Sequence, residues 1–134
     1  MHTLAAEVNA MAQLSWQALN LMQIFDVLRS ARTCHLAVEE DGQPWCVMMH
    51  FQFEIQGTDV IIHLTMPDHG RKLDAMAGND QVCIAIESPS CAWTDTVILT
   101  GRATVGVYVP GKAIHLRVRA KEISGRRYFL PEDV

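Results

Sequence analysis

The 134-residue sequence lacks most of the patterns that mark a familiar kind of site. No apolar run approaches the roughly 20 residues that a helix needs to cross a membrane. The four cysteines show no CxxC spacing, and the six histidines form no HxH or HExxH motif. No Walker-type loop or Ser-His-Asp arrangement is present. We therefore expect no membrane span, no structural zinc site and buried free thiols in a reducing, cytoplasmic compartment.

Positive charge is also scarce, since the formal net charge is −4 and the sequence pI is about 5.8. This balance gives no general attraction to nucleic acid or to anionic lipid. Hydrophobic residues make up 49% of the chain and charged ones 19%, which is enough to build a core. At this length we expect one domain over residues 1–134.

Two kinds of hydrophobic periodicity divide the chain. Residues 1–31 follow a helical period, with apolar positions recurring from Leu4 to about Ser30 and a possible break between Ser15 and Asn20. Residues 33–124 alternate with the period of a strand, except for a short helix near Gly70 that ends at Gly78. The expected strands are Thr33–Glu39, Pro44–Ile55, Val60–Thr65, Val82–Glu87, Trp93–Val107 and Ala113–Ile123, with the fifth bent at Gly101 or Gly106. This order predicts a mainly β protein, a six-stranded antiparallel barrel with an N-terminal helix and one inserted helix.

Two cationic residues open the predicted inserted helix. Arg71 and Lys72 lie in its first turn, where unpaired backbone N–H groups and the helix dipole already favour an anion. Charge alone would favour Asp or Glu at these positions. The pair therefore predicts a phosphate-binding corner, and the alternative is a solvated Arg-Lys pair on a surface helix.

The order of short motifs over residues 22–127 resembles the FMN-binding split-barrel proteins, which share the pyridoxamine 5′-phosphate oxidase-like fold. The resemblance is closest to the nitroimidazole-resistance-like branch. The motifs that carry it are GQPW at Gly42–Trp45, then VMMHF, HLTMPDHGRKL, VCIAIE, TVILTGRA at Thr96–Ala103, and ISGRR.

The resemblance implies a homodimer that holds FMN in a cleft at the subunit interface. It further implies an oxidoreductase in which the flavin reduces a small planar acceptor. Arg71 and Lys72 would contact the phosphate. The other implied contacts with the isoalloxazine ring, the ribityl chain or the phosphate are Val47, Met48, Met49, His63, Thr65, Met66 and Thr96.

Two departures from the family pattern argue against vitamin B6 as the substrate. Val47 stands where a true pyridoxamine-phosphate oxidase has an arginine, and ISGRR does not match that enzyme's C-terminal substrate motif. The alternative function is a non-catalytic flavin- or haem-binding dimeric barrel, for which His69 is a weak haem signal. His63 is either an acid-base residue or a strand-end histidine bonded to backbone, and a metal held by His50, His63 and Cys46 is a minor alternative.

Overall fold

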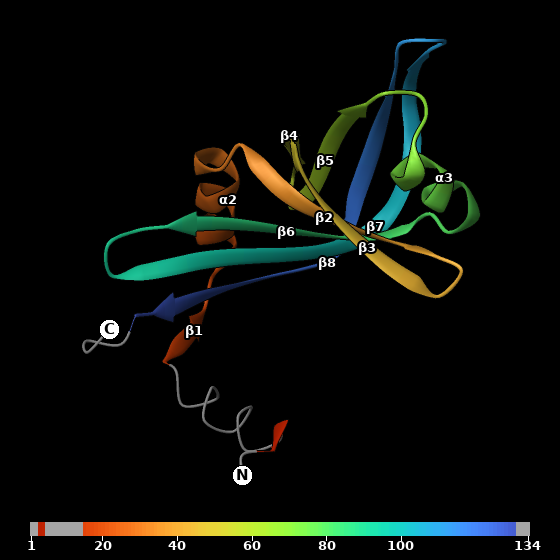
Figure 1. Ribbon diagram of the computed structural model, residues 1–134. Coiled ribbons are helices and arrows are strands. Elements are labelled where there is room, and N and C mark those ends of the chain that lie inside the picture. Colours follow the sequence, from red (N-terminus) through yellow and green to blue (C-terminus); the bar gives the residue numbers. More distant parts are fainter. Residues whose placement is uncertain (1–2, 5–14, 131–134) are drawn as a thin grey trace.

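The computed structural model describes residues 3–4 and 15–130, which form a strongly curved antiparallel sheet with two helices (Figure 1). Along the ladder the strand order is β3-β2-β6-β7-β8-β5-β4, with β1 paired to β8. The strands are β1 Trp16–Ala18, β2 Thr33–Glu40, β3 Gln43–His50, β4 Gln52–Gln56, β5 Asp59–Met66, β6 Gln81–Pro89, β7 Trp93–Val109 and β8 Ala113–Phe129. The helices are α2 Leu21–Ser30 and α3 Arg71–Gly78.

The sheet curls because its two edge strands are joined by a single residue. β3 and β4 lie at opposite ends of the ladder, yet only Phe51 separates them. Phe51 is buried, and its N–H donates to the carbonyl of Arg32 at 3.2 Å. The predicted split barrel is confirmed, but over the described residues the sheet is open and has eight strands where six were predicted. The predicted strand Pro44–Ile55 is two strands, and Trp16–Ala18 is an additional one. Side-chain alternation continues through the corner, so the sequence pattern does not reveal the change of partner.

The N-terminal helix is shorter than predicted within the described chain. Trp16–Ala18 is a strand paired with β8, and the helix begins at Leu21. Asn20 forms a capping box with Gln23, in which each side chain accepts from the other's backbone N–H at 2.9 Å. The capping box therefore fixes the start of α2 at Asn20. The apolar residues before it keep a helical spacing, so the spacing alone does not show where the helix begins. Residues 5–14 of the predicted helix lie outside the described residues.

The core lies on the inner face of the curved sheet, where α2 covers it (Figure 1). β2 and β6 contribute alternate residues to this face, as the strand period predicts. The most buried of these side chains include Leu28, Leu36, Ile84, Ile86, Val97, Leu99 and Val118.

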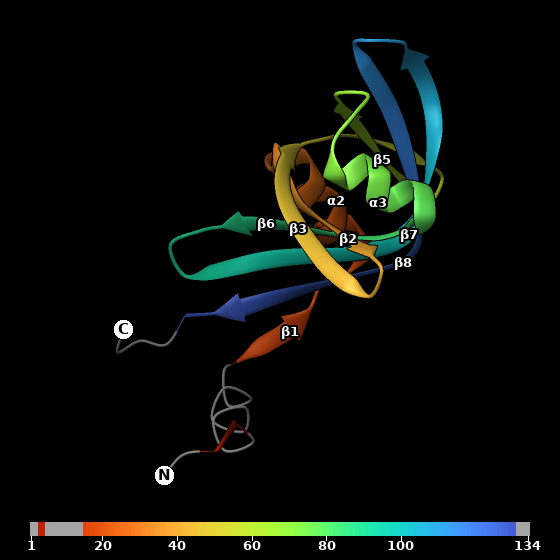
Figure 2. The same cartoon turned by 45° about the vertical axis from the view of Figure 1, so that its right-hand side comes forward.

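β7 and β8 are each 17 residues long and extend beyond the body as a hairpin arm (Figures 1 and 2). Their pairing shifts register between Thr100 and Gly101 and again between Val105 and Val107. Both predicted bend positions, Gly101 and Gly106, therefore coincide with irregularities. A Cβ on Gly101 would lie 2.3 Å from the carbonyl oxygen of Arg119, so the close strand approach needs a glycine here.

No helix in the described part of the chain has the length and hydropathy of a membrane span. All four cysteines are free thiols, as expected, although only Cys34 is fully buried. Burial raises the pKa of the Cys34 thiol to about 11. Cys46 and Cys91 are exposed, which corrects the expectation that the thiols are buried.

We expect Gly101→Ala to destabilise the fold by about 1–3 kcal/mol, because the added methyl group overlaps backbone that cannot rotate away. Urea denaturation followed by circular dichroism measures the loss. Gly78→Ala is the matched control, since a Cβ there meets no atom within 4 Å. Equal stability of the two variants would show that the approach of β7 to β8 does not require glycine.

Candidate functional site

The helix start predicted to bind phosphate, which we call the phosphate corner, is formed by the first turn of α3. The helix begins at Arg71, and its N-cap, Gly70, has φ 124°, a conformation that residues with side chains rarely adopt. Gly70 offers no side-chain cap, so the first-turn N–H groups lack a side-chain partner at this position. The guanidinium carbon of Arg71 lies 4.2 Å from the ring centroid of Trp45. Neither Arg71 nor Lys72 forms an ion pair with any described residue, so both charges remain available to an anion.

Acidic residues line the cavity beside this corner. The cavity has a volume of about 760 Å³ and is bounded by Arg71 together with Glu39, Glu40, Asp41 and Asp74. Because these carboxylates repel an anion, a bound phosphate is expected at the helix start near Trp45 and not in the middle of the cavity.

The loop that carries Gly70 is attached to the hairpin arm through Asp68. Its carboxylate accepts the backbone N–H of Gly111 at 2.7 Å and the hydroxyl of Tyr108 at 3.5 Å. The Gly111 N–H lowers the pKa of Asp68, and the hydrogen bond to His69 lowers it further. A contact between segments more than 40 residues apart thus positions the start of α3.

β3 leads from the phosphate corner to the split of the barrel. Trp45 lies near its first end and His50 at its last, a span of roughly 17 Å at the usual rise per residue. β3 pairs only with β2, so alternate backbone groups on its other edge are unpaired within the ladder. Three predicted contact residues lie between the two ends, namely Val47 and Met49, which are half-buried, and Met48, which is exposed.

A cleft, which we call the split cleft, opens where β3 passes into β4. Its volume is about 380 Å³. The residues that line it are Arg32, His50, Phe51, Gln52, His63 and Thr65. Two predicted site residues, His63 and Thr65, therefore meet residues from the opposite edge of the sheet.

His63 belongs to a row of hydrogen-bonded side chains, which we call the histidine chain. Its Nε2 lies 2.9 Å from Glu54 Oε1, and its Nδ1 lies 2.8 Å from His115 Nε2. His115 Nδ1 lies 3.5 Å from the Thr65 hydroxyl. Hydrogen bonds from Gln56 and then from His63 lower the pKa of Glu54. His63 is thus bonded to side chains and not, as one alternative had it, to backbone.

Two other predicted residues are less accessible to a ligand. Met66 is buried in the core, which leaves its backbone as the available contact. The Thr96 hydroxyl donates to the carbonyl of Arg126 at 3.4 Å. Across the described ranges, 3–4 and 15–130, no three His, Cys, Asp or Glu side chains converge on a possible metal position.

Sequence reasoning missed Arg32, Glu54 and His115 as members of one site. His115 lies on the polar face of a correctly predicted strand. That position indicates exposure to solvent, but it does not reveal the hydrogen-bond partners of the imidazole. The contact of Trp45 with Arg71 was also missed. None of these contacts has a local sequence signature, because each joins different segments of the chain.

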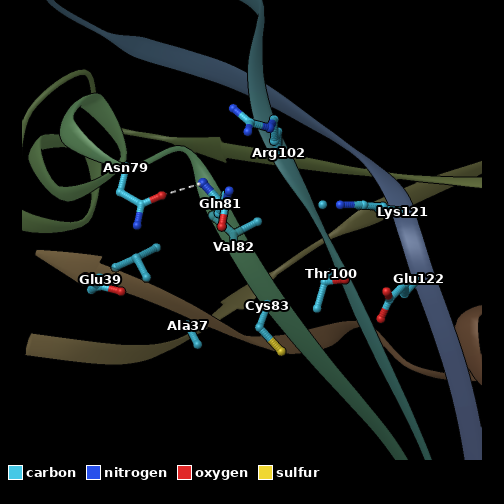
Figure 3. Close-up of a pocket in the computed structure, with 12 residues that line it drawn as sticks. Ala37, Glu39, Asn79, Gln81, Val82, Cys83, Thr100, Arg102, Lys121 and Glu122 are labelled. Atoms are coloured by element: carbon cyan, nitrogen blue, oxygen red, sulfur yellow. Dashed lines mark hydrogen bonds between the residues drawn. The ribbon is translucent and has the colours of Figure 1, made fainter. Parts of the chain in front are cut away.

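A third cavity is a groove on the outer face of the sheet, with a volume of about 470 Å³ (Figure 3). Cys83 on β6 and Thr100 on β7 line it from paired positions. At one end, Asn79 accepts the backbone N–H of Gln81 at 3.1 Å. The groove shares no lining residue with the split cleft. It shares Glu39 and Asn79 with the acidic cavity beside the phosphate corner.

The curved antiparallel sheet, split between β3 and β4, defines a split-barrel protein. The chain belongs to the pyridoxamine 5′-phosphate oxidase family, whose sequence profile matches residues 22–107. No curated protein matches the sequence.

Solved structures share the fold at low sequence identity. A provisionally named 5-nitroimidazole antibiotic resistance protein of Bacteroides thetaiotaomicron has a TM-score of 0.76 at 14% identity, covering 87% of this chain and 90% of its own. An FAD-binding protein of Mesorhizobium loti has a TM-score of 0.74 at 17% identity, with coverages of 86% and 98%. The FAD-binding protein of Mycobacterium smegmatis has a TM-score of 0.62 at 20% identity, with coverages of 84% and 98%.

We expect Asp68→Asn to lower thermal stability in a pH-dependent way. Because the folded-state pKa of Asp68 is lowered, its charge contributes stability above the ordinary Asp pKa, and this contribution is lost as pH falls through the folded pKa. The difference in Tm between wild type and variant should be largest near pH 7 and vanish at strongly acid pH. Glu87→Gln is the control, since its exposed carboxylate forms no ion pair with a described residue. A Tm difference between wild type and Asp68→Asn that does not change with pH would contradict a contribution from the charge of Asp68.

Proposed function

We propose that the protein binds FMN and acts as a flavin-dependent oxidoreductase on a small planar acceptor. The observation that carries the proposal is the placement of two un-neutralised cations, Arg71 and Lys72, at a helix start that no side chain caps. Family membership and the flavin-binding proteins among its structural neighbours support it. The departures at Val47 and at ISGRR argue against pyridoxamine phosphate as the substrate.

The residues of the chain supply binding and orientation. Arg71 and Lys72 hold the phosphate, while the free edge of β3 presents backbone donors and acceptors beside Val47, Met48 and Met49. His63 and Thr65 face the other end of this path. A bound flavin would supply the redox chemistry, with its ring toward the split cleft. The corner suits one phosphate group, which favours FMN over FAD because the neighbouring cavity is acidic.

We also propose a homodimer formed through the outer sheet face. Met48, His35, Ala85 and Ile98 form one cross-strand row over β3, β2, β6 and β7. Met48 is 67% exposed and Ile98 49%, while α2 covers the opposite face. Exposed large apolar side chains such as Met48 and Ile98 are typical of a surface that a partner covers. It includes Met48, so the interface and the β3 path are continuous.

The compartment and the alternative function follow from simpler observations. Four free thiols support a reducing cytoplasm. A non-catalytic flavin or haem carrier is the rival function, for which His69 is an exposed candidate ligand. The visible spectrum of the purified protein separates these possibilities, because flavin, haem and an empty protein absorb differently.

We expect the purified protein to be yellow. The double variant R71A/K72A should lose its flavin, because two charge-assisted contacts with the phosphate are removed. Its affinity for FMN should fall by about 100-fold or more. Fluorescence titration of FMN measures the affinity. The control K112A/K121A removes the same charge elsewhere on β8 and its turn. A wild type that is colourless and fails to take up FMN contradicts the cofactor, whereas equal affinity of both double variants contradicts the corner.

We expect Ile98→Asp to convert a dimer into a folded monomer of 15.0 kDa, because it buries a carboxylate in an apolar interface. Light scattering coupled to size exclusion measures the mass. Val107→Asp is the matched control, since Val107 is 62% exposed on the hairpin arm and outside the proposed face. A wild type that is monomeric at all concentrations would exclude the dimer.

A further inference from the structure

The split cleft carries donors that no described residue uses. The side chains of Arg32, His50 and Gln52 make no hydrogen bond or ion pair with the described chain. No carboxylate lines the cleft, in contrast with the acidic cavity beside Arg71. A volume of about 380 Å³ is within the range of small-molecule sites.

Two arginines lie at or beside the cleft. Arg32 lines it at the barrel split, and Arg117 shares the face of His63 across β5 and β8. Glu54 is the acidic group nearest to His63, and its carboxylate is already engaged by His63 and by the amide of Gln56. The potential in the cleft therefore favours an anion.

We propose that the split cleft binds the acceptor substrate of the protein through a carboxylate group of that substrate, held by Arg32. Thr65 is a second hydrogen-bond donor to this group, and it becomes available when the histidine chain takes up a proton. The inference rests on the proposed function, because it names the substrate class of that site. A carboxylate suits Arg32 because the planar guanidinium can donate two parallel hydrogen bonds to it.

The histidine chain explains the role of Thr65. With both imidazoles neutral, Glu54 accepts from His63 Nε2–H, and His63 Nδ1 accepts from His115 Nε2–H. His115 Nδ1 is then an acceptor, so the Thr65 hydroxyl donates to it and not to a ligand. The neutral chain therefore withholds this donor from the cleft.

Addition of one proton reverses this arrangement. His115 Nδ1 gains a hydrogen and donates to Thr65 Oγ1, which leaves the Thr65 O–H free to turn toward a carboxylate in the cleft. A second proton is opposed, because two N–H groups would then face each other across the 2.8 Å contact between His63 and His115. Binding of a carboxylate is thus coupled to the uptake of a single proton.

Titration of the flavin-loaded protein with benzoate and with benzamide at pH 6, 7 and 8 tests the proposal. The two probes have nearly the same shape, and benzoate stays ionised throughout this range. We expect benzoate to bind at least about tenfold more tightly than benzamide, and Arg32→Ala to remove this preference. Arg29→Ala is the control for loss of one arginine from the same end of α2.

The pH profile tests the histidine chain. Benzoate affinity should rise as pH falls from 8 to 6, by at most about tenfold per pH unit, as one linked proton requires. His115→Gln should flatten this profile, with circular dichroism confirming that the variant folds. Equal binding of benzamide, an unaffected R32A variant, or an unchanged profile in H115Q overturns the inference. The flavin absorbance, recorded separately, reports whether the proposed function itself fails.

Discussion

The turn at Phe51, which joins the two edge strands of the open sheet, is the constraint on which the rest of the molecule depends. The residue joins the two edges of the ladder, packs into the core and bonds its backbone N–H to Arg32. The turn brings residues from the two ends of the ladder close together, although β3 and β4 each pair with only one strand. Because β3 and β4 part at this residue, the barrel is split and not continuous, and a cleft forms at the split.

The same turn at Phe51 leaves β3 with two ends that differ in chemistry. Arg71 lies over Trp45 near the first end, and the uncommitted donors of the split cleft surround the second. A ligand with an anionic group at one end and a planar ring at the other matches this arrangement. The outer row through Met48 and Ile98 borders the same strand, so the proposed cofactor path and the proposed dimer face are parts of one surface.

Much of the fold could be predicted because its signals are local. Alternation identified the strands from β5 onward, and Gly101 and Gly106 marked the real irregularities of β7. The apolar stripe of the N-terminal segment hid both the strand Trp16–Ala18 and the cap at Asn20. Strand β1 exists because β8 continues to Phe129, and pairing between such distant segments leaves no periodic trace.

The sequence by itself determined the cationic helix start. Arg71 and Lys72 follow a glycine that a helix N-cap requires here, and their meaning depends on adjacent residues and on the helix dipole. Only the tertiary structure decided which side chains share the split cleft and the histidine chain. Arg32, His50 and His63 come from three separate segments of the chain. Glu54 and His115 lie 61 residues apart in the sequence. Hydrogen bonds of 2.8 and 2.9 Å need strand register as well as composition, and register is set by how the barrel closes.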